Sequence, residues 1–349
     1  MRSRLFNASL SKFGLPRISM LTHSRSKPRL PGRLVVLGAR GFISRHLQEW
    51  CARSSIPCRA VGSEEIDLTN TDNAPGLARL LKDGDAVVMT SMLTPEKGRD
   101  YRALMSNLRM AQTVCLALTQ AACSHFIYLS SDAVYDAHQI PLDEDSTREP
   151  IDLYALSHTA REMMLSSELD KKKIPVCLLR LTNVYGPGDT HNAYGPNRFV
   201  RTALSEGCIE LYGGGEERRS HVLIDDVIRL IGLVLGHGSG GSLNIAVRHV
   251  VSFSDVAQTV IRLAGKPVHL DYLPRTVPTI HRPYKVTQLF RFIYNLGRPI
   301  GPIVHRTFMN TAVFAAFPNF RFTPLDEGLA SFIEAERKGL NATPRIPSQ

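Results

Sequence analysis

Short apolar runs alternate with segments of helical periodicity through the first half of the chain. The apolar runs have the length and composition of buried strands, and they lie at 33–38, 57–62, 84–91, 125–131 and 175–181. Amphipathic segments of helical period lie between them, at 39–50, at 101–122 and from Tyr154 onward. Strands and helices in this alternation predict an α/β fold with a Rossmann-type, doubly wound parallel sheet.

The texture of the chain changes after residue 185. The segments NVYGPGD and HNAYGPNRF are rich in Gly, Pro and Asn, which is typical of loops that carry function. The apolar runs beyond them are shorter, and Ser252 opens a further helix. These changes predict a Rossmann domain over 33–185 and, over 186–340, a smaller C-terminal substrate-binding lobe that is partly interleaved with the sheet.

The apolar run VIRLIGLVLG is interrupted by Arg229 and is too short to span a bilayer, so we read it as a core helix and expect no transmembrane segment. The six cysteines show no CxxC pair and no Cys/His ligand spacing, which favours buried free thiols in a reducing compartment and predicts no metal site.

The formal charge of +10 is concentrated in two segments. Residues 1–33 hold eight Lys and Arg and residues 272–325 hold seven, neither with an acid, so the rest of the chain carries a small excess of acid. We therefore expect no nucleic-acid partner. The arginines of 285–310 alternate with aromatic and apolar residues, which leaves two interpretations: a surface for an anionic partner, or an amphipathic lobe helix with solvated charges.

Residues 1–32 are Ser- and Arg-rich, acid-free and weakly patterned. This composition is typical of a disordered basic tail, with Met20 as an alternative start, and also of an organelle targeting segment. The first interpretation predicts a cytoplasmic protein, and the second predicts an organellar one.

A glycine-rich turn joins the first strand to the first helix. Gly38, Arg40, Gly41, Phe42 and Ile43 lie where the pyrophosphate of a dinucleotide would meet backbone N–H groups and the helix dipole. The third glycine place of the fingerprint holds a serine, which is small enough for close packing. The alternative is an ordinary tight turn between a strand and a helix.

The tip of the second strand reads Gly62-Ser63 and has no carboxylate to bind the 2′-hydroxyl of NAD. Together with Arg40 beside the turn, this gives a slight preference for NADP over NAD. Arg40 is equally well explained as a solvated loop residue.

An ordered series of motifs resembles one family. The series is GARGFIS (38–44), DLTN (67–70), Asn107, YLSSDAVYD (128–136), PLDEDSTREPIDLYALSH (141–158), LRLTNVYGPGD (179–189), GPNRF (195–199) and RSHVLIDDV (219–227). It is similar to the extended short-chain dehydrogenase/reductases, specifically the NAD-dependent epimerase/dehydratase group that acts on nucleotide sugars. The resemblance runs from about residue 33 to 265 and fades toward 335.

The resemblance implies roles for individual residues. Ser131 would hydrogen-bond the reacting sugar oxygen, and Tyr154 would be the general acid/base. Residues implied in cofactor binding, besides the glycine turn, are Asp67, Leu68, Asn107, Tyr154 and His158. Residues implied in substrate binding are Ser131, Asn183, Asn197, Arg198 and Arg219. Arg219 suits the diphosphate because a guanidinium pairs well with phosphate oxygens, although a surface salt bridge is the plainer alternative.

The same family usually has Asp-Glu after the serine when it eliminates water. Here the pair is Asp132-Ala133, which disfavours dehydration and leaves epimerisation or simple redox chemistry open. The family also implies a homodimer that packs through the helices at 101–122 and 154–170.

The main departure is at position 158, where the family has a lysine that binds the nicotinamide ribose and lowers the tyrosine pKa. His158 is uncharged at neutral pH unless it is perturbed, because an ordinary histidine pKa is about 6.5. We expect catalysis by Tyr154, Ser131 and His158 with activity biased to acidic pH, which His158→Lys would extend upward. The alternatives are a non-catalytic nucleotide-binding or assembly subunit, and a site that never forms.

Overall fold

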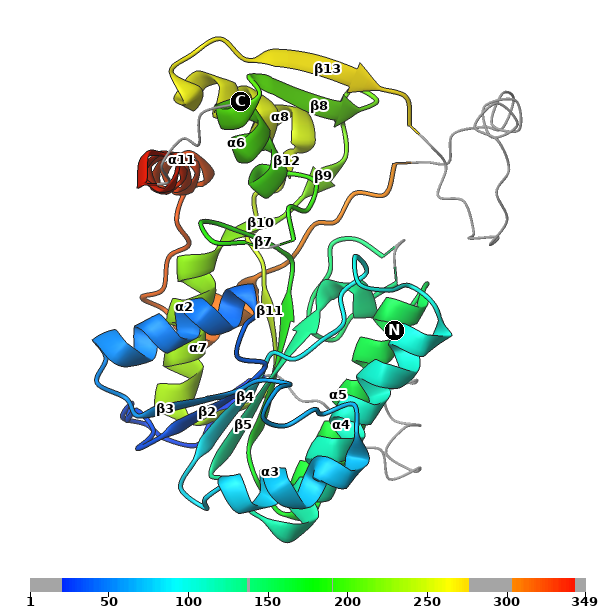
Figure 1. Ribbon diagram of the computed structural model, residues 1–349, viewed down its shortest axis with the longest axis vertical. Helices are drawn as coiled ribbons and strands as arrows, with labels where there is room; N and C mark the ends of the chain where they lie inside the picture. Colours follow the sequence, from blue (N-terminus) through cyan, green and yellow to red (C-terminus); the bar gives the residue numbers. More distant parts are fainter. Residues whose placement is uncertain (1–20, 137–138, 190, 276–302, 343–349) are drawn as a thin grey trace, which may run out of the picture.

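The computed structural model describes residues 21–136, 139–189, 191–275 and 303–342 (Figure 1). Its central sheet has seven strands in the order β1-β11-β6-β5-β4-β2-β3, all parallel except β1. The strands are β1 Thr22–His23, β2 Leu34–Leu37, β3 Cys58–Val61, β4 Ala86–Met89, β5 His125–Ser131, β6 Val176–Leu181 and β11 Ser239–Ile245. The predicted doubly wound parallel sheet is confirmed.

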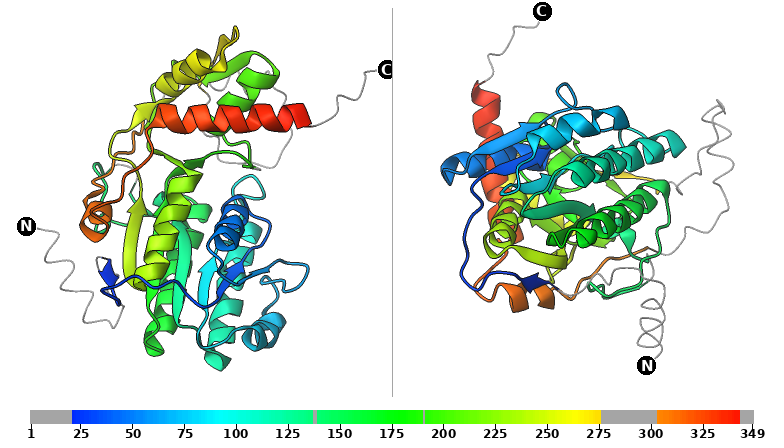
Figure 2. Two further views of the ribbon diagram at one scale, coloured as in Figure 1. Left: turned by 90° about the vertical axis from the view of Figure 1, so that its left-hand side faces the viewer. Right: turned by 90° about the horizontal axis from the view of Figure 1, so that it is seen from below.

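Helices cover both faces of this sheet (Figures 1 and 2). One face carries α2 Phe42–Arg53, α7 Ile224–His237 and α10 Thr311–Ala316, and the other carries α3 Ala74–Leu80, α4 Tyr101–Gln120 and α5 Leu153–Lys171. Each helix layer packs its apolar stripe on fully buried strands such as β2 and β4, so the sheet has a hydrophobic core on each side. Asp100 and Asp152 cap α4 and α5 by accepting hydrogen bonds from backbone N–H groups of the first turn.

A smaller lobe with its own core stands at the carboxyl edge of the sheet (Figure 2). Its elements are β7 Asn183–Tyr185, α6 Pro196–Ser205, β8 Cys208–Tyr212, β9 Arg218–Arg219, β10 His221–Leu223, β12 Val251–Ser252, α8 Phe253–Ala264, β13 His269–Leu273 and α11 Leu325–Ala342. The chain leaves the sheet after β6 and then returns to supply α7 and β11 before it completes the lobe. Interleaving of the two parts is therefore a feature of the topology.

The expectation of a free tail over 1–32 is wrong for its last residues. β1 pairs antiparallel with β11, and the backbone N–H groups of Arg25 and Arg29 donate to the carbonyls of His237 and Gly236. β1 thus extends the sheet edge, where unpaired strand groups find partners, and Arg25 and Arg29 hold the segment that follows against the last turn of α7. Residues 1–20, and the part of the basic segment 285–310 that falls within 276–302, lie outside the described residues.

None of the helices in the described residues is both long and apolar enough to cross a membrane. All six cysteines are free thiols, and Cys51, Cys123 and Cys177 are buried, whereas Cys58 is exposed.

Candidate active site

A pocket of about 590 Å³ runs along the carboxyl ends of the parallel strands, between the sheet and the lobe. The turn between β2 and α2 lines one part of it, and residues from the ends of β5, β6 and α5 line the other. Doubly wound sheets bind their ligands at this edge because the loops that follow the strands diverge there.

The glycine turn is built for close approach. Gly38 has φ 110°, and a Cβ atom there would lie 2.6 Å from Thr90 Oγ1 and 2.9 Å from the backbone nitrogen of Ser91. Only glycine therefore lets the turn pass against the end of β4. No side chain caps the N-terminus of α2 and no acid lies in its first turn, so its N–H groups and dipole remain available to an anion such as a pyrophosphate.

Asp67 and Leu68, two of the residues implied in cofactor binding, also line the pocket. Asp67 accepts hydrogen bonds from the backbone nitrogen and hydroxyl of Thr69, at 2.9 and 2.8 Å, and Leu68 is buried behind it. Arg40 donates to Glu64 at 2.5 Å and to Ser63 at 3.2 Å, with both charged side chains largely exposed. Just beyond the tip of β3, Glu64 thus places a carboxylate beside Arg40, which lines the pocket.

Ser131 and Tyr154 meet in the pocket from β5 and from the first turn of α5. Burial raises the pKa of Tyr154 to about 12, and Asp132 and Glu96 act in the same direction. A hydrogen bond with Ser131 and the charge of Arg161 oppose this rise in pKa. The tyrosine is therefore positioned for proton transfer and is held in its neutral form at pH 7.

His158 lines the same pocket, and its ring packs edge-on against the ring of Tyr154 with centroids 4.8 Å apart. Its Nδ1 is 2.7 Å from the hydroxyl of Tyr128, and its Nε2 is buried without a hydrogen-bond partner among the described residues. Burial, reinforced by Arg161, holds the pKa of His158 well below its usual range. Help to Tyr154 that depended on a charged His158 would therefore need a pH well below neutrality, because the ring is enclosed and already has a cation beside it.

Four residues that line the pocket have a buried polar atom with no partner among the described residues. One is the hydroxyl of Tyr185, which lies beside Gly328 of α11, and the other three are Ser91 Oγ, Thr94 Oγ1 and His158 Nε2. Buried polar groups are normally hydrogen-bonded, so unsatisfied ones around a pocket indicate a polar ligand that completes them. The glycine cradle and these three atoms suit the phosphates and ribose hydroxyls of a nicotinamide dinucleotide.

A buried ionic network fixes α5 against the sheet. Arg180 of β6 makes two hydrogen bonds of 3.0 Å to the carboxylate of Glu162, which also accepts from Ser130 at 2.6 Å. Arg180 additionally donates to the hydroxyl of Tyr135 at 2.7 Å. Because Glu162 lies one helical turn beyond His158, this network sets the rotation of α5 and with it the direction of both pocket residues.

The structure separates the predicted substrate residues into two groups. Asn183 is exposed and lines the pocket. Asn197 also lines it, but its amide is used within the lobe, accepting from Gly186 at 3.0 Å and donating to Val184 at 3.2 Å. Arg198 pairs with Glu210 at 2.6 Å and does not line the pocket.

Arg219 and Asn107 likewise lie outside the pocket lining. Arg219 donates through Nε to Glu217 at 2.7 Å, while its Nη1 is buried without a partner among the described residues. Asn107 spends both amide groups on the backbone of Leu93, at 2.8 and 3.1 Å. It therefore acts on the pocket only by fixing the loop after β4.

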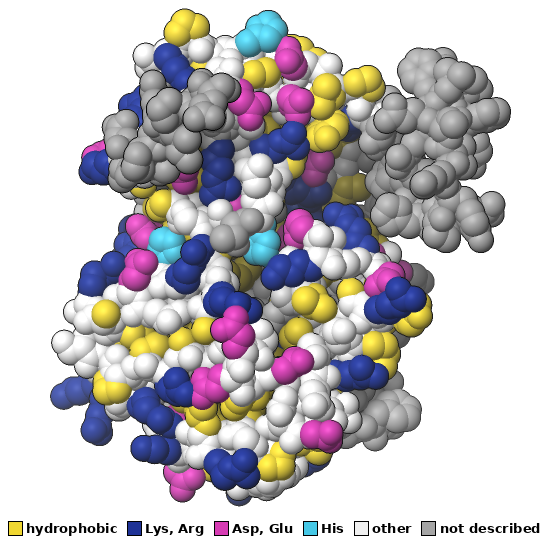
Figure 3. Space-filling model, in the orientation of Figure 1, with side chains coloured by type: hydrophobic (Ala, Val, Ile, Leu, Met, Phe, Trp, Pro, Cys, Tyr) yellow, Lys and Arg dark blue, Asp and Glu magenta, His cyan; other side chains and the backbone are white. Residues whose placement is uncertain are grey.

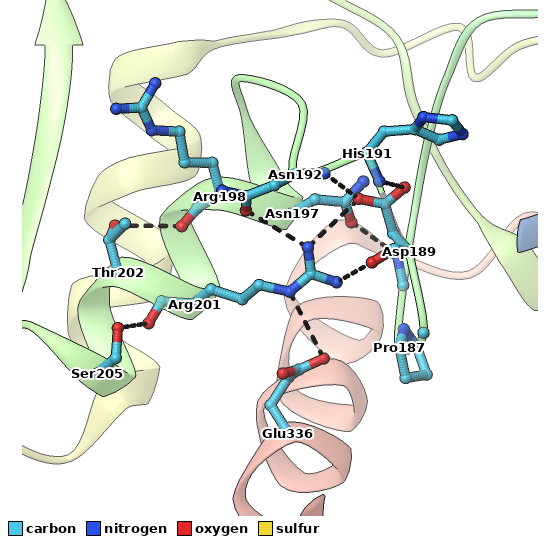
Figure 4. Close-up of polar contacts among 12 residues, drawn as sticks. Pro187, Asp189, His191, Asn192, Asn197, Arg198, Arg201, Thr202, Ser205 and Glu336 are labelled. Atoms are coloured by element: carbon cyan, nitrogen blue, oxygen red, sulfur yellow. Dashed lines mark hydrogen bonds and ion pairs between the residues drawn. The ribbon is translucent and has the colours of Figure 1, made fainter. Parts of the chain in front are cut away.

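A polar cluster ties the loop after β7 to the lobe (Figure 4). Arg201 of α6 donates to the backbone carbonyl of Asp189 and pairs with Glu336 of α11 at 3.9 Å. The carboxylate of Asp189 accepts from the backbone nitrogens of His191 and Asn192. Since Asp189 and His191 line the pocket, the cluster sets where the lobe closes over it.

The space-filling view shows basic side chains and histidines at the level where lobe and sheet domain meet (Figure 3).

Sequence reasoning missed two buried arginines next to this site. Arg306 follows the segment 276–302 and donates to the backbone carbonyl of Asp132 at 2.8 Å. Arg161 lies in α5 with its side chain fully buried. A single arginine in a helix or loop gives no sequence signal that distinguishes a buried position from a solvated one.

Comparison with known proteins identifies the family. The model of the NAD dependent epimerase/dehydratase family matches residues 34–246, which is more than half of the chain. The chain belongs to this family. The resemblance seen in the motifs is thus confirmed over residues 34–246, which include the parallel strands of the sheet and the first part of the lobe.

Curated epimerase/dehydratase relatives match about half of this chain. An ADP-L-glycero-D-manno-heptose-6-epimerase of Cupriavidus pinatubonensis is 30% identical over 186 residues, covering 50% of this chain and 56% of its own length. A dTDP-D-glucose 4,6-dehydratase of Mus musculus is 31% identical over 149 residues, covering 42% of each. The chain therefore spans about half the length of the curated relatives that it matches.

Solved structures share the fold over nearly their full length. MoeE5 in complex with UDP-glucose and NAD superposes with a TM-score of 0.71 at 24% identity, covering 88% of this chain and 100% of that one. A GDP-L-fucose synthetase from Naegleria fowleri bound to NADP gives 0.72 at 14% identity, covering 94% and 99%. At this identity the comparison supports the fold alone.

Proposed function

We propose that this epimerase/dehydratase family member is an NAD(P)-dependent epimerase or oxidoreductase that acts on a nucleotide sugar. One observation carries the proposal: the glycine cradle and the pair Ser131–Tyr154 belong to one continuous pocket, with unpartnered polar atoms of Ser91, Thr94 and His158 in its walls. A dinucleotide that lies along this pocket would have its pyrophosphate at α2 and its nicotinamide end at Tyr154.

The residues of the chain divide the chemistry between them. In its phenolate form Tyr154 would take the proton of the reacting sugar hydroxyl, and Ser131 would orient that hydroxyl by hydrogen bonding. A bound nicotinamide supplies the hydride acceptor. His158 is neutral, so it serves as a hydrogen-bond partner for a ribose hydroxyl through Nε2 and does not act as a cation.

The nucleotide end of the substrate is assigned to the lobe. Asn183 lines the pocket, and Arg219 of β9 has a buried Nη1 without a hydrogen-bond partner among the described residues. Relatives and structural neighbours carry ADP-, dTDP- and UDP-sugars in their names, which supports the substrate class. Ala133 in the place of a glutamate disfavours dehydration, so epimerisation or simple redox chemistry is the proposed reaction.

The cofactor is proposed as either NADP or NAD, with only a slight preference for NADP. Arg40 is exposed and could receive a 2′-phosphate, but it is paired with Glu64, which would have to move or would itself bind a 2′-hydroxyl. Neighbours with NAD and with NADP share the fold.

We further propose a homodimer in a reducing compartment. Exposed apolar side chains gather on the outer helices α4 and α5, and they are Tyr101, Met105, Leu116, Leu156 and Met163. A patch of this kind on neighbouring helices suits a second copy of the chain. The six unpaired thiols support a compartment such as the cytoplasm.

A second candidate is a non-catalytic binding or assembly subunit. It is favoured by the combination of a neutral His158 and a Tyr154 whose pKa is raised to about 12, since phenolate is then scarce at pH 7. In that case the pocket would bind a dinucleotide without turnover.

The test combines cofactor titration with turnover. Calorimetry with NAD and NADP should show binding of at least one, and isotope exchange of hydride with UDP-, GDP-, dTDP- and ADP-sugars should show turnover. Tyr154→Phe should lower kcat by about 10²- to 10⁴-fold, the usual contribution of general acid–base catalysis, with little change in cofactor affinity. Cofactor binding without turnover of any nucleotide sugar would favour the second candidate.

A further inference from the structure

Arg161 lies on the same face of α5 as the two pocket residues. It follows His158 by three positions and Tyr154 by seven, so the three side chains form one stripe along the helix. Its side chain is fully buried, with 0% exposure.

The guanidinium of Arg161 lies directly behind the pocket wall. Its Nη2 donates to the backbone carbonyl of Ser91 at 2.7 Å, and its Nη1 is 2.6 Å from the sulfur of Met92. Both of those residues line the pocket. On its other side the guanidinium carbon is 4.9 Å from the centroid of the Tyr128 ring, whose hydroxyl bonds to His158.

No carboxylate among the described residues pairs with Arg161. A buried charge without an ionic partner costs several kcal/mol, and replacing it with an apolar side chain of similar volume is often neutral or stabilising. The surroundings of Arg161 include the sulfurs of Met89 and Met92, so an apolar chain would be well accommodated. The stability of the fold therefore gives no reason to keep a cation at this position.

The positive charge of Arg161 does act on Tyr154, the proposed proton-transfer group. It lowers the pKa of both Tyr154 and Tyr128, against the effect of burial, and it helps to keep the pKa of His158 low. Tyr128 has no other hydrogen-bond acceptor among the described residues, so its hydroxyl proton is directed to Nδ1 of His158. The ring proton then remains on Nε2, where it can be donated to a ligand in the pocket.

We propose that His158 and Arg161 divide the two roles of the absent lysine: His158 Nε2 binds the ribose of the cofactor, and Arg161 supplies the permanent positive charge that favours Tyr154 phenolate. Arg161 acts through space and through the Tyr128–His158 pair, so it is a positioning residue. Its catalytic consequence rests on the proposed function, whereas its effect on the phenol can be measured without any ligand.

The deciding experiment titrates residue 154 in the cofactor-free protein. A fluorinated tyrosine, whose phenol is intrinsically more acidic, is placed at position 154 and followed by fluorine NMR as pH rises. Arg161→Met should raise the pKa of that phenol by about 1, the effect of a unit charge about two helical turns away at an effective dielectric constant of about 20. The double variant His158→Lys with Arg161→Met should return the pKa to the wild-type value or below it.

Lys171→Met is the matched control, because it removes one positive charge from the exposed end of the same helix. It lies more than one screening length from Tyr154 and should leave the titration unchanged. An unchanged titration in Arg161→Met would overturn the proposal, and so would a failure of His158→Lys to restore the pKa. Failure of Arg161→Met to fold would also overturn it, since a structural need would then explain the arginine.

Kinetics separate this proposal from the proposed function. If the wild type turns over a nucleotide sugar, Arg161→Met should lower the rate of the proton-abstracting step by about tenfold at a fixed pH below the phenol pKa, matching the change in that pKa. If no nucleotide sugar turns over, the proposed function fails, and the ligand-free titration still decides the role of Arg161.

Discussion

Arg161 and Arg180 are the two largest side chains that the described residues bury completely, and their surroundings differ in one respect. Arg180 is held by two hydrogen bonds to Glu162 and one to Tyr135. Arg161 has a carbonyl, two thioethers and an aromatic face, but no carboxylate. The ion pair between Arg180 of β6 and Glu162 of α5 fixes the helix against the sheet. An unpaired buried charge keeps its electric field, which can act on a neighbouring group that changes its charge during a reaction.

The largest difference between the two arginines is expected in stability, when the paired one, Arg180, is truncated. Arg180→Met should lower the free energy of unfolding by about 3–5 kcal/mol, because Glu162 loses its buried partner and keeps only the partly exposed Arg148, at 3.5 Å, as an ionic neighbour. Denaturant titration measures it. Adding Glu162→Leu should recover most of the loss, and Arg161→Met should change stability by less than about 1 kcal/mol or increase it. Equal losses in Arg180→Met and Arg161→Met would show that the two arginines have the same structural role.

The same contrast separates two arginines of the lobe. Arg219 has a buried Nη1 with no partner among the described residues, whereas Arg198 is paired with Glu210 near the surface. Arg219→Ala should weaken nucleotide-sugar binding by about 1.5–3 kcal/mol, the scale of a hydrogen bond to a charged group. Arg198→Ala should weaken it by less than about 0.5 kcal/mol. Calorimetry with a nucleotide sugar measures both, and a larger effect at Arg198 would place the diphosphate on the other side of the lobe.

The pH dependence of stability gives a further test, because His221 is buried without a hydrogen-bond partner among the described residues. Burial, with Arg219 beside it, lowers the pKa of His221 to about 3, and neither ring nitrogen has a partner among the described residues. In the unfolded chain, His221 is protonated with the ordinary histidine pKa of about 6.5, whereas in the folded protein it stays neutral to a much lower pH. The stability that depends on a neutral ring is therefore complete above pH 6.5 and is lost as pH falls. Between pH 7 and pH 5 the loss from His221 should be about 2 kcal/mol.

His221→Phe keeps a ring against Phe253 and removes the titration. The variant should therefore lose about 2 kcal/mol less than the wild type over the same interval, measured by denaturant titration at each pH. His158 and His125 add to the acid sensitivity in the same direction, since burial lowers the pKa of both, that of His125 to about 4. An identical pH dependence in His221→Phe and wild type would contradict this account.

Much of the site followed from local sequence. The glycine turn between β2 and α2, the strand that ends at Ser131 and the helix that begins just before Tyr154 are each specified within a short segment, so these elements could be placed before the fold was seen. The chemistry of Ser131 and Tyr154 was implied by the resemblance to the family. Asn107 and Asn197 carry the expected motif letters, but the structure spends their amides on backbone groups of Leu93, Gly186 and Val184. An amide gives no sign in the sequence of whether its partner is a ligand or a neighbouring loop.

The sequence by itself determined the parallel sheet and the position of the glycine turn, because hydrophobic periodicity and turn chemistry are properties of neighbouring residues. The roles of the serine and the tyrosine in the pocket were implied by the resemblance to the family. Only the tertiary structure decided the protonation state of His158, which stands where the family has a lysine. His158 is neutral because Tyr128, thirty residues away in the chain, and Arg161 enclose it. Protonation depends on burial and on charges brought together by packing, and these are properties of the folded chain that no local pattern encodes.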